Sequence, residues 1–261
     1  MQHPKHILEQ LNIRPRKKWG QNFLVHQNNV QSIVEFADPP EHSNILEIGP
    51  GLGAMTETLI QIAKQYIAVE FDPILYDYLQ KTFTGKHVDF IHDDILNVSI
   101  SDLFAGQTFT VIANLPYHIT TPIIERLLAQ RHRIESMTLL LQKEVVSRML
   151  AQPGSKTYGR LSVWIQSLCN TQKGPTLKPG CFMPKPDVDS QVIKLMPRKT
   201  EMNAAFFDFV NILFQKRRKT IGNILKSSGY DTSRTDETIL ASRPEDLSIE
   251  ILATLFRQTA I

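Results

Sequence analysis

Four residues at the end of an apolar run carry groups suited to handling an aromatic amine. The run 111–113 (Val-Ile-Ala) is typical of a buried strand, and Asn-Leu-Pro-Tyr follows it directly at 114–117. The amine of an aromatic base is a poor nucleophile, because its lone pair is delocalised into the ring. The amide oxygen of Asn114 and the carbonyl oxygen of Leu115 can accept from such an amine and aim its lone pair at an electrophile, while Tyr117 offers a ring for stacking. Taken alone, the four residues also suit a proline-containing turn.

A glycine-rich turn and two acids form a second group of candidates. The stretch EIGPGLGAMT follows an apolar run, and Gly49, Gly51 and Gly53 remove side chains where the backbone must turn and a ligand can approach. Glu70 ends the next apolar run, where a carboxylate can accept from both ribose hydroxyls of an adenosine, and Asp94 ends the third, where it can accept from an adenine amine. Sites for NAD and for S-adenosylmethionine (AdoMet) share such a ribose acid, but the spacing here is G-x-G-x-G rather than the dinucleotide pattern G-x-G-x-x-G. The alternative is a tight turn without a ligand.

The elements that must position these residues alternate along the chain. We expect strands at 45–48, 66–70, 88–94, 109–116 and 136–142, with helices at 54–65 and 73–83 among the segments between them. This alternation predicts parallel βαβ units and an open sheet covered on both faces, which is a Rossmann-like α/β domain. Because ligands bind outside the carboxyl ends of such strands, Asn114 is expected to face the same crevice as Gly49 and Glu70.

The pattern changes beyond Pro153. Residues 162–170 suit either a strand or a helix, and 191–197 suit a strand. Beyond Arg198 the apolar spacing is helical, at 206–215, 218–228 and 247–258. We therefore predict an α/β domain at 1–199, which includes a basic N-terminal segment, and a small all-helical domain at 200–261.

Composition and charge narrow the class of protein. The 261 residues are 42% hydrophobic and 21% charged, which is ordinary for a globular protein with a buried core. No apolar run approaches the roughly 18 residues that span a bilayer, and the polar start does not resemble a signal peptide. Cys169 and Cys181 have neither metal-ligand nor redox spacing, so we expect no metal and a cytoplasmic location. The net charge of +3 is concentrated at 14–18 (RPRKK) and 216–219 (KRRK), which favours a polyanionic partner.

Taken together, the motifs resemble one family. EIGPGLG, the acid of VEFDP, the aspartate of HDDIL and NLPYHIT are similar to the motifs of the ribosomal RNA adenine N6-dimethyltransferases. WGQNFL (19–24) resembles the family's N-terminal motif, LQKEVVSRM, YGRLSV and FMPKPDVDS resemble later blocks, and FQKRRKTIGNIL resembles the helical tail. The resemblance extends from Arg16 to about Leu225, with the blocks in the family's order. It implies an AdoMet-dependent methyltransferase domain followed by a helical domain that helps to grip RNA.

The resemblance also implies roles for individual residues. Those implied to bind AdoMet are Asn22, Leu24, Gly49, Gly51, Glu70, Asp94 and Asn114. Asn114 and the Leu115 carbonyl would orient the target amine, and Tyr117 and Phe182 would sandwich the adenine. The alternative for Phe182 is a core anchor for the proline-rich segment. The candidate phosphate contacts, each also compatible with a solvated surface, are Lys17, Lys18, Arg217, Arg218 and Lys219.

Three positions depart from the family's pattern. Ile95 stands where many relatives carry a small residue, which would tighten the adenine pocket without removing its acceptor. Asp187 stands where relatives often carry lysine, which removes a phosphate contact, and Lys216 adds charge at a position that is often polar.

Within the family, the later blocks look most like the bacterial housekeeping enzyme. That enzyme dimethylates two adjacent adenosines near the 3′ end of small-subunit ribosomal RNA, so the expected partner is a partly assembled small subunit, bound by a monomer. The alternatives are a large-subunit enzyme that confers macrolide resistance, and a mitochondrial relative that acts as a transcription factor, which the absence of a transit-like N-terminus disfavours. From other classes, an RNA-binding assembly factor with a vestigial site remains open. An NAD-dependent oxidoreductase would use the same glycine turn and Glu70 but leaves NLPY and FMPKP unexplained.

Overall fold

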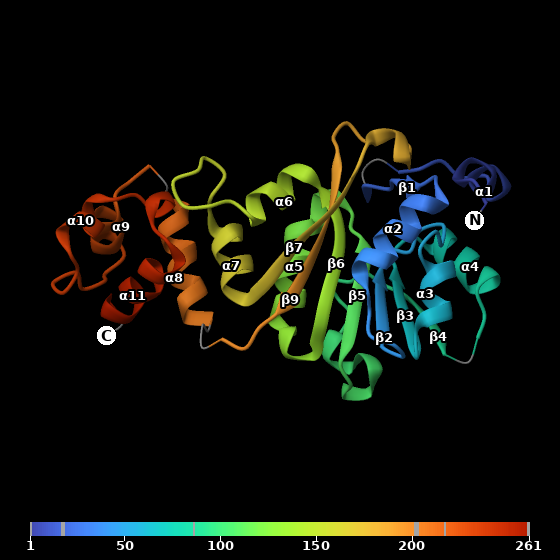
Figure 1. Cartoon of the computed structure of the whole chain (residues 1–261), viewed down its shortest axis with the longest axis horizontal. Coiled ribbons are helices and arrows are strands. Elements are labelled where there is room, and N and C mark those ends of the chain that lie inside the picture. The colour runs from blue at the N-terminus through green and yellow to red at the C-terminus, as the bar shows by residue number, and fades with distance from the viewer. Residues whose placement is uncertain (1, 17–18, 86, 201–203, 217, 260–261) are drawn as a thin grey trace. The chain divides into compact units, whose positions relative to one another are not determined.

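The computed structural model describes residues 2–16, 19–85, 87–200, 204–216 and 218–259 (Figure 1). The chain forms two compact units, the first of Met1–Lys143 with Gln172–Pro197 and the second of Glu144–Thr171 with Arg198–Ile261. The second unit thus includes residues 144–171, which lie within the predicted first domain. The domain boundary between residues 199 and 200 stays a prediction.

A seven-stranded sheet organises the first unit, and only residues 169–171, at the start of its last strand, belong to the second unit. Its order is β4 (Val88–His92), β3 (Gln65–Glu70), β2 (Asn44–Ile48), β5 (Phe109–Asn114), β6 (Ile134–Gln142), β9 (Ser190–Pro197) and β7 (Cys169–Leu177). The first five strands pair in parallel, and β9 runs antiparallel to β6. The chain runs outward from β2 to β4 and then returns to place β5 beside β2. This reversal is a topological switch point, where open α/β sheets bind ligands.

The predicted strands are found because parallel strands buried on both faces appear in sequence as continuous apolar runs. Every residue of β2 is buried, and so are the first five of β5. Observed strand ends differ from the predicted ones by up to two residues. The α/β, Rossmann-like fold class is confirmed.

The helices of the first unit are α1 (Pro4–Gln10), α2 (Gln27–Ala37), α3 (Thr56–Ile62), α4 (Pro73–Thr82) and α5 (Thr120–Ala129). Helix α4 begins sharply, because Asp72 accepts from the backbone N–H of Ile74 at 3.0 Å and Pro73 needs no hydrogen-bond partner at the first position. Buried side chains from α2 and α3 join those of β2, β5 and β6 in one core, which includes Ile33, Leu59, Ile45, Ile112 and Leu140.

The helices of the second unit are α6 (Lys143–Met149, of which Lys143 belongs to the first unit), α7 (Arg160–Leu168), α8 (Ala204–Gln215), α9 (Ile221–Ser227), α10 (Glu237–Ala241) and α11 (Ile249–Thr259). The ambiguous stretch 162–170 is helical as far as Leu168, and β7 starts at the next residue. Aromatic rings pack between α8 and α11, where the ring centroids of Phe209 and Phe256 are 5.5 Å apart. At Gly222 a Cβ would come within 3.2 Å of the Leu240 carbonyl, so glycine permits the close packing of α9 against α10.

A small two-stranded sheet joins two segments that are far apart in the sequence. Strand β1 (Phe23–Leu24) pairs antiparallel with β8 (Phe182–Met183), and Leu24 lies opposite Phe182. The motifs WGQNFL and FMPKPDVDS are therefore neighbours in the structure. Within the described ranges, the helices are too short or too polar for any of them to cross a membrane.

Candidate active site

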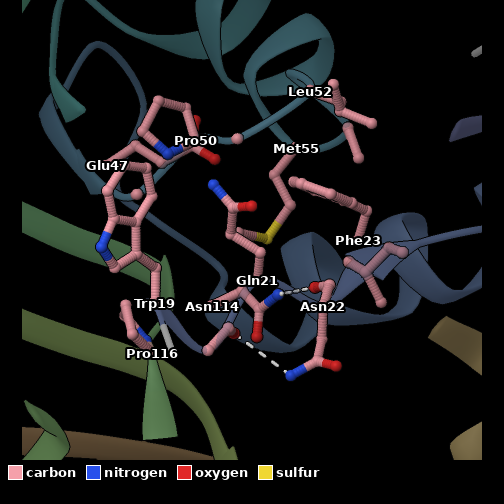
Figure 2. A pocket seen from close by; sticks show the side chains of 15 residues that line it. Trp19, Gln21, Asn22, Phe23, Glu47, Pro50, Leu52, Met55, Asn114 and Pro116 are labelled. Carbon is pink, nitrogen blue, oxygen red and sulfur yellow. Dashed lines mark hydrogen bonds between the residues drawn. The ribbon is translucent and has the colours of Figure 1, made fainter. Parts of the chain in front are cut away.

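The carboxyl ends of the central strands open onto three cavities in the first unit. The turn cavity is lined in part by the glycine-rich turn that follows β2 (Figure 2). The strand-end cavity, of about 300 Å³, lies beyond β3 and β4, and it shares Trp19, Gln21, Gly49 and Pro116 with the turn cavity. The proline-side cavity, of about 450 Å³, is lined by residues 20–22, 117–118, 142 and 184–188. The first two cavities adjoin at the switch point between β2 and β5.

The glycine turn needs its glycines for two different reasons. Gly49, Gly51 and Gly53 have φ of 67°, 61° and 79°, in the left-handed region. Gly49 lines both adjoining cavities, so a side chain there would take up space in them. At Gly53, by contrast, a Cβ would come within 2.4 Å of the Phe83 ring, so this glycine serves packing against the end of α4.

Glu70 lies at the end of β3 and lines the strand-end cavity. It is buried, and its two oxygens accept from the backbone N–H groups of Gly51 at 3.0 Å and Asp72 at 2.8 Å. Burial raises the pKa of Glu70, although these two hydrogen bonds act in the opposite direction. Each oxygen keeps a second lone pair, so the carboxylate can still accept from hydroxyl groups of a ligand.

Asp94 and Phe71 line the same strand-end cavity. One oxygen of Asp94 accepts from the backbone N–H of Leu96 at 2.9 Å. This bond holds the Asp94 side chain in the loop that follows β4. Ile95, which is buried, follows it on the cavity wall. Phe71 is 51% exposed, so it presents an apolar ring on the wall of this cavity.

The N-terminal segment lies across the adjoining cavities. Trp19 packs edge-on against Phe71, with ring centroids 5.2 Å apart, and the guanidinium of Arg16 lies 4.1 Å from the Trp19 ring centroid. Gln21 donates from Nε2 to Asp72 Oδ2 at 3.0 Å, which ties the segment to the start of α4. Asn22 and Leu24 line the turn cavity. Figure 2 shows Trp19 and Phe23 on opposite sides of that cavity.

A buried polar cluster lies beneath the glycine turn. Glu47 Oε2 accepts from the hydroxyls of Thr56 at 2.8 Å and Tyr66 at 2.5 Å. Its other oxygen, Oε1, is buried and has no hydrogen-bond partner among the described residues. Burial raises the pKa of Glu47 from 4.5 to about 7, so the carboxyl group is partly protonated near neutral pH.

The segment after β5 lines the turn cavity with Asn114 and Pro116, and it lines the proline-side cavity with Tyr117 and His118. Asn114 lines the turn cavity, and its Nδ2 donates to the backbone carbonyl of Asn22 at 3.0 Å (Figure 2). Since this bond engages the nitrogen end of the amide, its oxygen is left as the acceptor. The Leu115 side chain is buried, and the backbone N–H of Leu115 donates to the backbone carbonyl of Leu140 at 3.2 Å. Tyr117 lines the proline-side cavity.

Phe182 lies elsewhere. Its side chain is 2% exposed and belongs to the core cluster with Leu24 and Ile33. It is absent from the described residues that line the three cavities. The structure therefore does not bring Phe182 together with Tyr117 around a common space, and its burial favours the alternative of a core anchor for the proline-rich segment.

The predicted phosphate contacts are only partly described. Lys17, Lys18 and Arg217 lie outside the described residues. Arg218 and Lys219 line a cavity of about 430 Å³ in the second unit together with Phe214, Gln215 and Lys216. Lys216 Nζ also donates to the Ser227 hydroxyl at 3.1 Å. Of the described side chains, no group of three or more histidines, cysteines and acids is arranged to hold a metal ion.

Several cavity-lining residues were not predicted individually. Trp19 and Gln21 stand in the WGQNFL motif, Phe71 follows Glu70 directly, and His118 follows Tyr117. Loop residues of this kind show no hydrophobic period, so only their position next to a predicted residue signalled them. The place of Phe71 on the cavity wall is recognisable only in the folded chain.

The donors and spaces of the two adjoining cavities fit AdoMet. The buried carboxylate of Glu70 faces the strand-end cavity beside the exposed ring of Phe71, which suits a ribose with an attached base. The turn cavity has glycine backbone on one side and the Asn22 and Asn114 amides on the other, which suits the polar amino-acid end. A seven-stranded sheet in which β9 runs antiparallel to β6, with such a site at its switch point, is typical of an AdoMet-dependent, Rossmann-like methyltransferase.

Comparison with known proteins gives the family. The family described as "Ribosomal RNA adenine dimethylase" matches residues 12–250, and the chain belongs to it. The chain is 40% identical to "Ribosomal RNA small subunit methyltransferase A" of Chlorobaculum tepidum over 249 residues, which cover 94% of this chain and 90% of the relative. It is also 40% identical to the protein of that name from Anoxybacillus flavithermus, over 97% of this chain and 93% of the relative.

Solved structures share the fold. A dimethyladenosine transferase from Plasmodium falciparum superimposes with a TM-score of 0.77 at 22% identity, covering 92% of this chain and 98% of the other. The 23S rRNA methyltransferase ErmE gives a TM-score of 0.71 at 24% identity, covering 92% of this chain and all of the other. These two similarities support the fold class, whereas the family membership is carried by the sequence.

Proposed function

We propose that this protein transfers methyl groups from AdoMet to the N6 amines of two adjacent adenosines near the 3′ end of small-subunit ribosomal RNA. The observation that carries the proposal is the position of residues 114–117. Asn114 lines the turn cavity, Tyr117 lines the proline-side cavity, and residues 20–22 line both cavities. A methyl donor on one side and a flipped base on the other would meet at Asn114.

The reaction requires mainly positioning. AdoMet, when bound, supplies an electrophilic methyl group. The oxygen of Asn114, whose nitrogen donates to Asn22, and the carbonyl of Leu115 accept from the adenine amine and turn its lone pair toward the donor. No strong general base is needed, because the amine becomes acidic once methylated. Tyr117 provides the stacking ring, and for Phe182 we propose the anchoring role that its burial favours.

The cofactor residues follow from the same arrangement. Glu70 holds the ribose, Asp94 the adenine amine, and the backbone at Gly49 and Gly51 the amino-acid end. Asn22 and Leu24 close the turn cavity from the N-terminal segment. The candidate phosphate contacts remain Lys17, Lys18, Arg217, Arg218 and Lys219. The monomeric state and the cytoplasmic location are likewise proposed from the sequence.

The names of relatives favour the small subunit as substrate. Both relatives at 40% identity carry the name small subunit methyltransferase A, and they match more than nine-tenths of this chain. The 23S enzyme ErmE is 24% identical. We therefore propose the large subunit only as an alternative substrate.

The test offers both subunits to the purified protein with AdoMet labelled on its methyl group. The small subunits are taken from cells that lack this modification, and the large subunits serve as the control. The proposal expects label in small-subunit RNA alone. Label confined to large-subunit RNA would overturn the substrate, and a lack of label on both would favour a vestigial site.

A further inference from the structure

We infer that Ser190 is a positioning residue for the acceptor base, and that its hydroxyl holds the Tyr117 ring in the orientation in which the base stacks on it. The inference rests on the proposed function, since it assigns a part in base recognition. Ser190 is the last residue of the FMPKPDVDS block, whose ending had no assigned role.

A direct hydrogen bond links the two residues. Tyr117 Oη and Ser190 Oγ are 2.7 Å apart, and either hydroxyl can donate. Tyr117 stands on a short 3₁₀ turn, Tyr117–Ile119, directly after Pro116, so its backbone is fixed at one end of the side chain. The bond to Ser190 fixes the other end. Because Oη lies on the long axis of the tyrosine ring, fixing both ends sets the direction of that axis and so where the ring stands at the cavity wall.

Ser190 is itself held firmly. It is 0% exposed and is the first residue of β9, opposite Gln142 of β6 in the antiparallel ladder. Its neighbour Asp189 accepts through its backbone carbonyl from the N–H of Lys143 at 2.9 Å, and its carboxylate pairs with Lys178 at 2.8 Å. The Ser190 hydroxyl is thus a rigid point on the sheet rather than part of a flexible loop.

The ring that this bond orients faces the acceptor side. Tyr117 is half-buried and lines the proline-side cavity with Gln142, the residue opposite Ser190. A buried hydroxyl pair could serve only to satisfy its own hydrogen bonds. Here, however, Tyr117 lines the proline-side cavity, and Ser190 begins β9 just after the proline-rich segment 184–188, which lines the same cavity. The bond therefore connects the two walls between which the base must fit.

The test is a double-mutant cycle on methyl transfer to unmodified small subunits, with Ser190→Ala, Tyr117→Phe and the double variant. Tyr117→Phe keeps the stacking ring and removes only the hydroxyl. We expect each single variant to lower kcat/KM by about three- to tenfold, the range for one lost hydrogen bond. We expect the double variant to be no worse than either, with AdoMet affinity unchanged throughout. Ser167→Ala, which removes a buried hydroxyl in the second unit, serves as the control and should keep wild-type activity.

Each outcome decides the inference. Additive losses in the double variant, or wild-type kcat/KM in Tyr117→Phe, would overturn it. If Ser190→Ala fails to fold, Tyr117→Phe alone still decides. A wild-type protein that methylates no small-subunit RNA would refute the proposed function and the inference with it, whereas an active wild type with unaffected variants refutes the inference alone.

Discussion

At the scale of single residues, the site depends on groups whose polar atoms are already partly engaged. Asn114 donates to the Asn22 carbonyl, and Glu70 accepts from two backbone N–H groups. Such bonds fix the direction of the remaining lone pairs before a ligand arrives, which is what electrostatic preorganisation requires. Glu70, Asp94 and Asn114 were predictable because each ends an apolar run. The burial of Phe182 was not, because a lone aromatic in a proline-rich segment has no periodic neighbours to indicate its environment.

The first prediction concerns Asn114. Asn114→Ala should lower kcat for methyl transfer by roughly 100-fold, since it removes an acceptor that orients the amine, as loss of one preorganised group typically does. The AdoMet Kd, measured by calorimetry, should rise by no more than about tenfold, the upper range for one lost hydrogen bond, because Asn114 also lines the turn cavity. Asn223→Ala, on the exposed surface of α9, is the matched control. A kcat close to that of the wild type would contradict the assigned role.

The second prediction concerns Glu47 and pH. Its pKa rises from 4.5 to about 7 on folding, so between these values the folded protein keeps a proton that the unfolded chain has released. The free energy of unfolding should therefore fall as the pH rises through this window, by up to about 3 kcal/mol at about 1.4 kcal/mol per unit of pKa. In Glu47→Gln this fall should be much smaller, whereas the exposed Glu41→Gln should keep it. Urea titrations at several pH values between 4.5 and about 7 measure this free energy. If it falls equally with pH in the wild type and in Glu47→Gln, the prediction is contradicted.

At the scale of elements, the strands position the candidate cofactor residues, and β1 of the small β1–β8 sheet lines the turn cavity. The strand series was predictable because buried parallel strands are continuously apolar. Residues 162–170 were ambiguous, since a short apolar run does not distinguish a strand from a buried helix. The pairing of β1 with β8 was not predictable from the pattern, because each strand has only two residues. It is the contact that brings Leu24, beside the turn cavity, against Phe182.

The third prediction follows from that pairing. Phe182→Ala should lower the free energy of unfolding by about 3 to 5 kcal/mol, as expected when a buried phenylalanine is truncated. It should also weaken AdoMet binding, because Leu24 loses its support. Phe182→Leu, which keeps most of the volume, should lose much less of both. If Phe182→Ala impairs methylation while stability and AdoMet affinity stay near normal, the stacking role is correct and the anchoring role is not.

The fourth prediction concerns the N-terminal segment. In a Trp164→Phe variant, Trp19 is the single remaining tryptophan, and it lines both adjoining cavities. Its emission should change on addition of AdoMet and reach saturation. Gln21→Ala, which removes the bond to Asp72, should raise the AdoMet Kd by about three- to tenfold, the range for one hydrogen bond. Unchanged Trp19 emission at saturating AdoMet would show that the segment does not cover the cofactor.

At the scale of the whole molecule, one unit carries the candidate cofactor site and the other carries a cavity lined by basic residues. The helical character of the C-terminal region was predictable from its apolar spacing. The assignment of residues 144–171 to the second unit was not, because it depends on contacts between α7 and α8 that no local pattern reveals. The net charge of +3 is too small to identify an RNA partner by itself, so the location of the basic residues carries that part of the proposal.

The fifth prediction concerns the basic cavity of the second unit. Arg218→Ala and Lys219→Ala should each weaken RNA affinity and reduce the slope of log K against log salt by about 1, as expected for the loss of one phosphate contact. AdoMet affinity should not change. Lys81→Ala, in the last turn of α4, is the matched control and should leave the slope unchanged. An unaltered salt slope for both variants would remove these residues from the RNA interface.

The most direct measurement is the nucleoside composition of small-subunit RNA after reaction. Unmodified small subunits are incubated with AdoMet and either the wild-type protein or Asn114→Ala, and the RNA is digested and mapped by mass spectrometry. We expect N6,N6-dimethyladenosine at two adjacent positions near the 3′ end with the wild type, and little or none with Asn114→Ala. A methyl group on any atom other than adenine N6, or equal dimethylation by the two proteins, would contradict it.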